Sequence, residues 1–106
     1  MQISCLEDQD LVTIAVEGEL EVYSLPEFSR LAESYLGGPA RLVLDMERLE
    51  YIDSSGLGFL VTLHERLQRQ SQSLRVVNLQ PHVARVFRIT RLDQILDICA
   101  VAEPAL

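Results

Sequence analysis

Two adjacent hydroxyls beside a carboxylate give one short segment of the sequence the clearest chemical potential. Asp53, Ser54 and Ser55 are followed directly by Gly56-Leu57-Gly58. Leucines at helical spacing after this point predict a helix over 53–70, so both hydroxyls would lie at its N-terminus. A helix N-terminus exposes unpaired backbone N–H groups and partial positive charge, which suit an anion such as phosphate. The two glycines predict a flat backbone surface without side chains.

Nucleophilic catalysis by these serines is disfavoured by the rest of the sequence. The run lacks the leading glycine of the G-x-S-x-G elbow, and a serine nucleophile needs a histidine base. His64 would lie more than two turns further along the same helix, and His82 falls in the first turn of another. We therefore expect no enzyme. The plainer alternative, that Asp53 to Ser55 only cap a helix, stays open at this point.

Metal and cofactor sites are not indicated either. The sequence has no H-x-x-H pair, no calcium-type carboxylate loop and no G-x-x-x-x-G-K-[ST] phosphate loop. Cys5 and Cys99 lack metal-ligand spacing, which favours two reduced thiols, although a disulfide between the first and last strands stays possible. We expect no metal and no cofactor.

Composition limits the size and the partners of the protein. A chain of 106 residues with 48% apolar residues is sufficient for one domain, here 1–106. Its net charge of −7 disfavours nucleic acid and favours a basic partner surface. Apolar runs are too short to span a membrane, and the N-terminus does not resemble a signal peptide, so we expect a cytoplasmic protein without membrane insertion.

The pattern of elements predicts an α/β fold. Strands are expected at 1–6, 11–18, 41–45, 74–78 and 94–99, and helices at 24–36, at 53–70 and from Pro81 onward, with 100–106 as a tail or a final turn. Strand–helix–strand units force parallel neighbours, while the first two strands form a hairpin. The order therefore predicts a mixed sheet of four to five strands with helices mainly on one face.

The first helix carries a marked start signal. Ser24 and Glu27 fit a capping box, in which each side chain bonds the backbone of the other. Tyr23 and Phe28 are spaced to form a hydrophobic staple across that cap. Phe28, Leu31 and Ala32 then supply the apolar stripe of a helix that lies on a core.

Taken together, these residues resemble the STAS domain of bacterial anti-sigma factor antagonists. The resemblance rests first on Asp53 to Gly58, preceded by Leu42-Val43-Leu44-Asp45 and Tyr51-Ile52. It extends over nearly the whole chain, through Gly18-Glu19-Leu20, Leu74-Arg75-Val76-Val77, Val83-Ala84-Arg85-Val86-Phe87 and Leu92.

The resemblance implies a phosphorylation switch. The serine after the motif aspartate is the phosphoacceptor of that family, which by position is Ser54. A cognate anti-sigma factor, a serine kinase with a histidine-kinase-like ATPase fold, would phosphorylate it, and a PP2C-type phosphatase would reset it. The unphosphorylated protein would bind the kinase and release the sigma factor. The partner surface would comprise Glu21 and the six motif residues, Asp53, Ser54, Ser55, Gly56, Leu57 and Gly58.

The sequence departs from the family pattern at two positions, and one alternative function is compatible with the same resemblance. The family usually has aspartate where this chain has Glu21, and it often has glycine in the position of Arg91, within Thr90-Arg91-Leu92. The alternative function is a constitutive STAS accessory subunit that docks on the ATPase of a membrane transporter.

Overall fold

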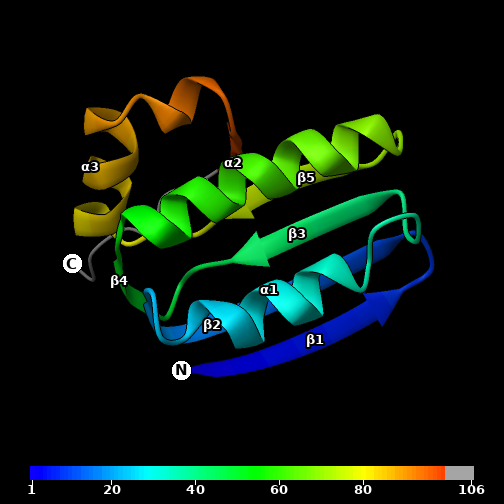
Figure 1. Ribbon diagram of the computed structural model, residues 1–106, viewed down its shortest axis with the longest axis horizontal. Helices are drawn as coiled ribbons and strands as arrows, with labels where there is room; N and C mark the ends of the chain where they lie inside the picture. Colours follow the sequence, from blue (N-terminus) through cyan, green and yellow to red (C-terminus); the bar gives the residue numbers. More distant parts are fainter. Residues whose placement is uncertain (100–106) are drawn as a thin grey trace.

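The computed structural model describes residues 1–99, which form one α/β domain built on a mixed sheet (Figure 1). This confirms the predicted fold class. The elements are β1 (Gln2–Asp8), β2 (Leu11–Leu20), α1 (Leu25–Glu33), β3 (Arg41–Asp45), β4 (Leu49–Ile52), α2 (Ser54–Arg69), β5 (Ser73–Val77), α3 (Pro81–Ile89), the 3-10 helix η1 (Leu92–Gln94) and β6 (Asp97–Ile98). The expected tail or final turn at 100–106 lies outside the described residues.

The sheet has the strand order β1-β2-β3-β5-β6, and β4 pairs with β2. Among the described strands only the β1–β2 pair is antiparallel, and the other pairs are parallel, as the strand–helix–strand order predicts. Val12, Ile14 and Val16 of β2 are buried on one face. The nearly continuous apolar character of β2 therefore reflects its central position between β1 and β3.

The sequence reading missed one strand, β4. β2 is ten residues long, and its last part, Gly18 to Leu20, pairs with β4 after its first part has paired with β3. The register shifts between Gly18 and Glu19, where Gly18 adopts φ +105°, a conformation that side chains rarely tolerate. This bend brings the end of β2 beside β4, which leads directly into α2.

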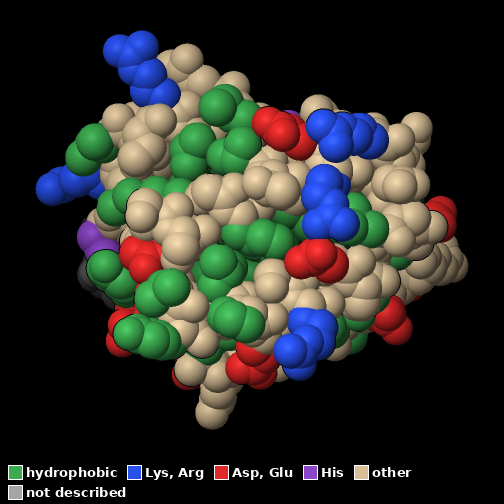
Figure 2. Space-filling model, viewed as in Figure 1, with side chains coloured by type: hydrophobic (Ala, Val, Ile, Leu, Met, Phe, Trp, Pro, Cys, Tyr) green, Lys and Arg blue, Asp and Glu red, His purple; other side chains and the backbone are tan. Residues whose placement is uncertain are grey.

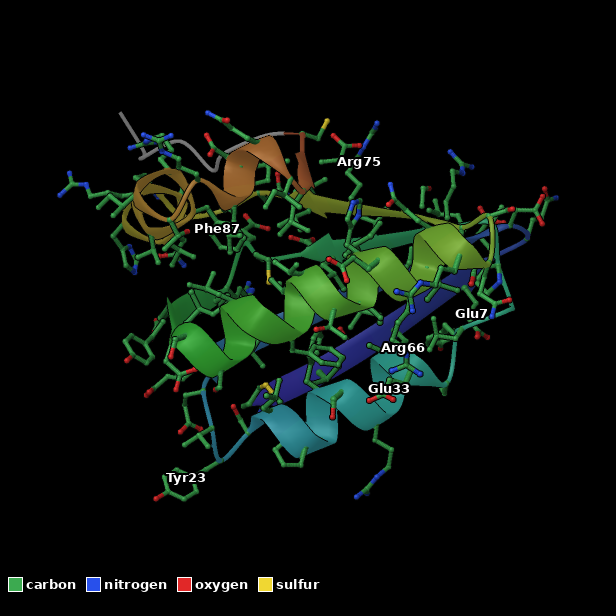
Figure 3. All side chains as sticks on the ribbon, turned by 45° about the horizontal axis from the view of Figure 1, so that its top comes forward. Glu7, Tyr23, Glu33, Arg66, Arg75 and Phe87 are labelled. Atoms are coloured by element: carbon green, nitrogen blue, oxygen red, sulfur yellow. The ribbon has the colours of Figure 1, made fainter. Side chains whose placement is uncertain are left out.

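Helices α1 and α2 lie side by side across one face of the sheet, as predicted, and α3 lies at its end next to β4 (Figure 1). The Phe28 and Phe59 rings pack edge to face between α1 and α2, with their centroids 5.7 Å apart. Arg66 and Glu33 join the same two helices by a 2.9 Å ion pair on the surface (Figure 3). An exposed pair of this kind contributes little to stability, so the packed aromatic and aliphatic side chains hold the helices on the sheet.

The core beneath the helices is made of large aliphatic and aromatic side chains from every layer. Its fully buried members are Ile14, Leu20, Phe28, Leu42, Leu44, Met46, Leu49, Leu60, Leu63, Leu67, Leu79 and Phe87. Leu20 and Leu49 come from the β2–β4 pair, so the core extends directly under the N-terminus of α2. Because each large side chain buried there contributes ~1.5–3 kcal/mol, the strands that support the motif are firmly anchored.

The N-terminal cap of α1 differs from the predicted capping box. Ser24 is the N-cap residue, but its side chain makes no cap bond within the helix and Glu27 does not reach back. Instead, the Glu21 carboxylate accepts from the N–H groups of Tyr23 (3.2 Å) and Ser24 (2.9 Å), and the Ser24 hydroxyl accepts from the N–H of Glu21 (3.0 Å). The reciprocal pair is thus shifted three residues towards the N-terminus. The predicted staple is wrong as well, since Tyr23 is 89% exposed.

The C-terminal part of the described chain also differs in detail from the prediction. The predicted strand at 94–99 is reduced to β6, preceded by η1. Arg91 ends α3 in the left-handed conformation, φ 62° and ψ 19°, at the position where the sequence lacks glycine. Cys5 and Cys99 are free and exposed; Cys5 lies on β1 and Cys99 directly follows β6, at opposite edges of the sheet, so a disulfide between them is excluded.

Candidate functional site

Asp53 connects three chain segments at the N-terminus of α2. It is the N-cap residue, and its Oδ1 accepts from the Ser55 hydroxyl (2.6 Å) and from the Gly56 N–H (3.1 Å). Its Oδ2 accepts from the N–H of Val22, in the loop before α1 (3.2 Å). Its own N–H donates to the carbonyl of Leu20, at the end of β2 (3.2 Å). One side chain therefore fixes the start of α2 against the β2–α1 loop.

These hydrogen bonds also set the ionisation of Asp53. The Ser55 hydroxyl and then the Gly56 N–H stabilise the charged carboxylate, which lowers the pKa of Asp53 below its ordinary value of 3.8. The carboxylate is therefore ionised at neutral pH and compensates the positive end of the helix.

The two serines of the motif have different surroundings. Ser55 is half-buried and its hydroxyl is held by Asp53, whereas Ser54 is exposed. Within residues 1–99, the Ser54 hydroxyl has no hydrogen-bond partner. The geometry thus presents one hydroxyl of the pair, on the first residue of α2, to anything that approaches from solvent.

The two glycines of the motif also differ. A Cβ on Gly56 would lie 2.8 Å from Cγ1 of Ile52 and 3.0 Å from the carbonyl oxygen of Leu20, so α2 contacts the strands here through bare backbone. A Cβ on Gly58 would meet nothing within 4 Å. Gly56 and the neighbouring Leu57 are buried and support the site from below, while Gly58 is exposed beside Ser54 on the first turns of α2.

Glu21, the remaining sequence-predicted site residue, lies in the loop that Asp53 holds. Its carboxylate is directed at the backbone of Tyr23 and Ser24, where it orders the loop before α1. The structure thus brings Glu21 to the same end of the molecule as the motif, although its carboxylate bonds its own loop rather than Asp53 or Ser54.

Sequence reasoning missed an apolar rim around the motif. Three of the six large hydrophobic residues that the described chain exposes lie here: Val22 (56%), Tyr23 (89%) and Tyr51 (50%). Tyr23 projects away from the protein (Figure 3), and hydrophobic side chains gather over the end where α1, β4 and α2 begin (Figure 2). Tyr23 was assigned to a staple and Tyr51 to a connection. Tyr23 lies on a turn and Tyr51 on the outward side of β4, and no sequence signal marked the second because β4 itself was missed.

The histidines are not arranged for catalysis at the motif. Nε2 of His82 donates to the carbonyl oxygen of Glu50 (2.6 Å), and Nδ1 of His64 is buried without a partner. The described part of the chain contains no group of three or more His, Cys, Asp or Glu residues that could hold a metal ion. The chemistry left to the motif is that of an exposed hydroxyl.

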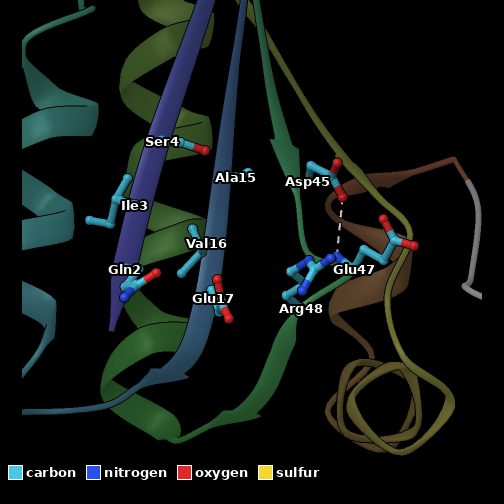
Figure 4. A pocket seen from close by; sticks show the side chains of 9 residues that line it. All are labelled: Gln2, Ile3, Ser4, Ala15, Val16, Glu17, Asp45, Glu47 and Arg48. Atoms are coloured by element: carbon cyan, nitrogen blue, oxygen red, sulfur yellow. Dashed lines mark hydrogen bonds between the residues drawn. The ribbon is translucent and has the colours of Figure 1, made fainter.

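The concave features of the surface lie elsewhere. A pocket of about 250 Å³ opens on the other side of the sheet, between β1, β2 and the β3–β4 connection (Figure 4). Its polar lining includes Glu17, Asp45, Glu47 and Arg48, and the Glu47 N–H donates to Oδ1 of Asp45 (3.1 Å). No motif residue lines this pocket.

Comparison with known proteins identifies the family. Residues 6–97 match the family model described as "Mlab, STAS domain", which covers most of the chain. The chain belongs to the STAS domain family. The motif at the start of α2 therefore belongs to a STAS domain, and the resemblance found in the sequence is confirmed.

Relatives and solved structures agree with this assignment. The chain is 29% identical over 103 residues to the anti-sigma-B factor antagonist of Bacillus subtilis, covering 97% of this chain and 94% of that protein. An anti-sigma factor antagonist from Mycobacterium paratuberculosis has the same fold, with a TM-score of 0.82 at 23% identity over 99% of this chain and 86% of that one. The phosphorylated form of the Bacillus cell fate determinant SpoIIAA aligns with a TM-score of 0.75 at 20% identity, covering 96% and 93%.

None of the helices in residues 1–99 combines the length and the apolar character that crossing a membrane requires.

Proposed function

We propose that this STAS domain is an anti-sigma factor antagonist switched by phosphorylation of Ser54. The unphosphorylated protein binds an anti-sigma factor serine kinase and thereby releases a sigma factor in the cytoplasm. The kinase transfers phosphate to Ser54, and a PP2C-type phosphatase removes it. The protein itself acts as a binding module and not as an enzyme.

The observation that carries this proposal is that Ser54 and Ser55 differ in their exposure and in the hydrogen bonds of their hydroxyls. A kinase needs a hydroxyl that can enter its active site and give up its proton. Ser54 is exposed, whereas the Ser55 hydroxyl donates to Asp53 at 2.6 Å and would have to break a charge-assisted bond first. Ser54 is therefore the favoured acceptor on geometry alone, in agreement with its position in the family motif.

The surroundings of Ser54 suit a switch that acts on binding. Gly58 leaves open space beside it, and Val22, Tyr23 and Tyr51 add exposed apolar area. A partner that covers this surface excludes water from it. A phosphate carries roughly −1.5 to −2 charge at pH 7. Burying that charge without compensation costs several kcal/mol, and each ~1.4 kcal/mol weakens binding tenfold.

Relatives support the same reading. The name of the Bacillus subtilis relative describes an antagonist of an anti-sigma factor, and SpoIIAA has been solved in a phosphorylated form. The alternative function, an accessory subunit on a transporter ATPase, would use the same surface without a phosphate. The description of the family model names Mlab and not an antagonist, so the experiment below discriminates between the two.

The test uses the serine kinase with a histidine-kinase-like ATPase domain from the same genome. Intact-mass and peptide mass spectrometry after incubation with ATP should place one phosphate on Ser54. Ser54→Ala should abolish phosphorylation and still bind the kinase, and Ser54→Asp should bind roughly tenfold more weakly or worse. Ser55→Ala is the matched control and should still be phosphorylated.

Two results would refute the proposal. Phosphate on Ser55 would move the acceptor by one residue. Absence of any phosphate, together with stable co-purification of the chain with a transporter ATPase, would favour the constitutive accessory subunit.

A further inference from the structure

Three of the nine basic residues of this acidic protein lie on α3 and directly after it, and Asp93, which lines the same hollow as Arg88, follows them. From Ser71 to Leu92 the sequence contains no Asp or Glu, although the chain as a whole carries a net charge of −7. Arg85, Arg88 and Arg91 follow one another at intervals of three residues, and all three are exposed. Within residues 1–99 none of them forms a salt bridge. Ile89 lies among them in the sequence, and its side chain is 74% exposed.

This surface, which we call the α3 surface, lies at the same end of the molecule as Ser54. The N-terminus of α3 is fixed to β4 through the 2.6 Å bond between His82 and the carbonyl of Glu50, and β4 leads directly into Ser54. Figure 1 shows α3 next to β4 and the start of α2, and Figure 2 shows basic side chains that project at that end. A protein seated on Ser54 and Tyr51 would need only a short extension to reach the α3 surface.

Arg91 occupies a backbone position that would suit glycine better. It adopts φ 62° and ψ 19°, the left-handed conformation that glycine occupies without a steric penalty. Gln9, Ser71 and Asn78 share this conformation, so the strain alone assigns no role to the side chain. It does allow a variant, Arg91→Gly, that removes an exposed charge without weakening the fold.

We infer that the α3 surface docks an acidic segment of the same partner that covers Ser54, with an apolar residue of that segment against Ile89. Three exposed guanidiniums and one exposed isoleucine on the same short segment complement carboxylates next to an aliphatic or aromatic side chain. A membrane or a nucleic acid is disfavoured as the occupant, because the net charge of −7 would be repelled by an extended anionic surface. A short acidic segment contacts only the local positive charge. This inference rests on the proposed function.

The test measures the affinity of the same serine kinase for the wild-type chain and for Arg85→Glu, Arg91→Gly, Ser54→Asp and Arg69→Glu. Arg69→Glu is the matched control, since Arg69 is exposed in the last turn of α2, at the other end of that helix from Ser54. Arg85→Glu should weaken binding roughly tenfold, and added salt should weaken the wild-type complex more than this variant. Arg69→Glu should bind like the wild type.

Arg91→Gly separates a binding role from a structural one. It should raise the melting temperature, because glycine relaxes the left-handed position, and yet bind the kinase more weakly. Replacing the contacted acidic residue of the kinase by arginine should restore binding to Arg85→Glu.

The outcomes distinguish this inference from the proposed function. If Ser54→Asp weakens binding while Arg85→Glu and Arg91→Gly bind like the wild type, the proposed function stands and the inference is overturned. If the wild-type chain does not bind the kinase, the proposed function and this inference are both refuted. Two further results would overturn the assigned occupant: adsorption of the wild type, but not of Arg85→Glu, to phosphatidylglycerol vesicles, or a dimer in sedimentation that Arg85→Glu dissociates.

Discussion

The carboxylate of Asp53 accepts a hydrogen bond from the backbone N–H of Val22, a residue 31 positions earlier in the chain, at 3.2 Å. This bond fastens the loop before α1 to the start of α2. The bond matters because Val22 and Tyr23 belong to the apolar rim, whereas Ser54 follows Asp53 directly at the start of α2. A single carboxylate thus keeps a hydroxyl and two exposed apolar side chains in a constant arrangement.

We expect Asp53→Asn to lower the free energy of unfolding at neutral pH. The amide keeps the shape of the side chain but loses its charge, and its nitrogen cannot accept from Val22. Because the pKa of Asp53 is lowered by folding, the stabilisation is present above its ordinary value of 3.8 and disappears as the pH falls through the lower, folded-state pKa.

Urea titrations of the wild type and Asp53→Asn at pH 7 and at pH 2–3 measure this effect. The two midpoints should be clearly separated at pH 7 and converge in acid. A separation that stays constant with pH would show that the charge of Asp53 is not involved.

Substitution by alanine should lower the stability of the protein at Gly56 and raise it at Gly58. Gly56→Ala forces a Cβ against Ile52 and the backbone of Leu20, and such overpacking costs ~1–3 kcal/mol. Gly58→Ala enters open space in a helix and should stabilise by up to ~1 kcal/mol. Thermal melts of the two variants compare them directly.

Gly58 also offers a test of the partner surface. Gly58→Leu should fold normally and yet lose binding to the kinase without any phosphate, since it fills the space beside Ser54. Unchanged affinity for Gly58→Leu would place the interface elsewhere.

The shifted cap of α1 predicts which side chains stabilise it. Ser24→Ala removes the acceptor for the Glu21 N–H and a donor to the carbonyl of Glu19 (2.8 Å), so the loss should be ~1–2 kcal/mol. Glu27→Ala should change stability by less than ~0.5 kcal/mol, since Glu27 makes no cap bond and interacts only with the helix dipole. Equal losses of stability for the two variants would instead support the capping box predicted from the sequence, between Ser24 and Glu27.

Phosphorylation of Ser54 should leave the fold almost as stable as before. The N-terminus of α2 favours an anion by ~0.3–1 kcal/mol, and the neighbouring Asp53 carboxylate opposes it by a similar amount. As ~1 kcal/mol shifts the melting temperature of a domain of this size by about 4–8 °C, the two forms should melt within a few degrees of each other. Circular dichroism melts on both forms decide this, and a large drop on phosphorylation would mean that the switch acts by unfolding.

The sequence was informative wherever local patterns and burial act together. The nearly continuous apolar run of β2 and the leucine spacing of α2 located those elements correctly, since the side chains that make these patterns are those that the core buries. The N-cap role of Asp53 was equally local. β4 was missed because its four residues carry no period of their own and are held by pairing with the distant end of β2.

The parts of the site that escaped prediction have two causes. The spacing of Tyr23 and Phe28 suits a staple, but a competing local arrangement, in which the Glu21 carboxylate orders the loop, leaves Tyr23 in solvent. The requirement for a bare backbone at Gly56 depends in part on the carbonyl of Leu20, which is distant in sequence and is brought there by the pairing of β2 with β4.

The double pairing of β2 has a consequence for the length of the chain between β3 and β4. Since β3 pairs with Leu11 to Ala15 and β4 with Gly18 to Leu20, one residue added between these two strands would leave the body of the sheet intact. If that residue shifted β4 by one step along β2, instead of being absorbed in the connection, the two faces of the strand would be exchanged. Tyr51 would then point inward and Ile52 outward, so the recognition surface would be inverted inside an otherwise unaltered domain.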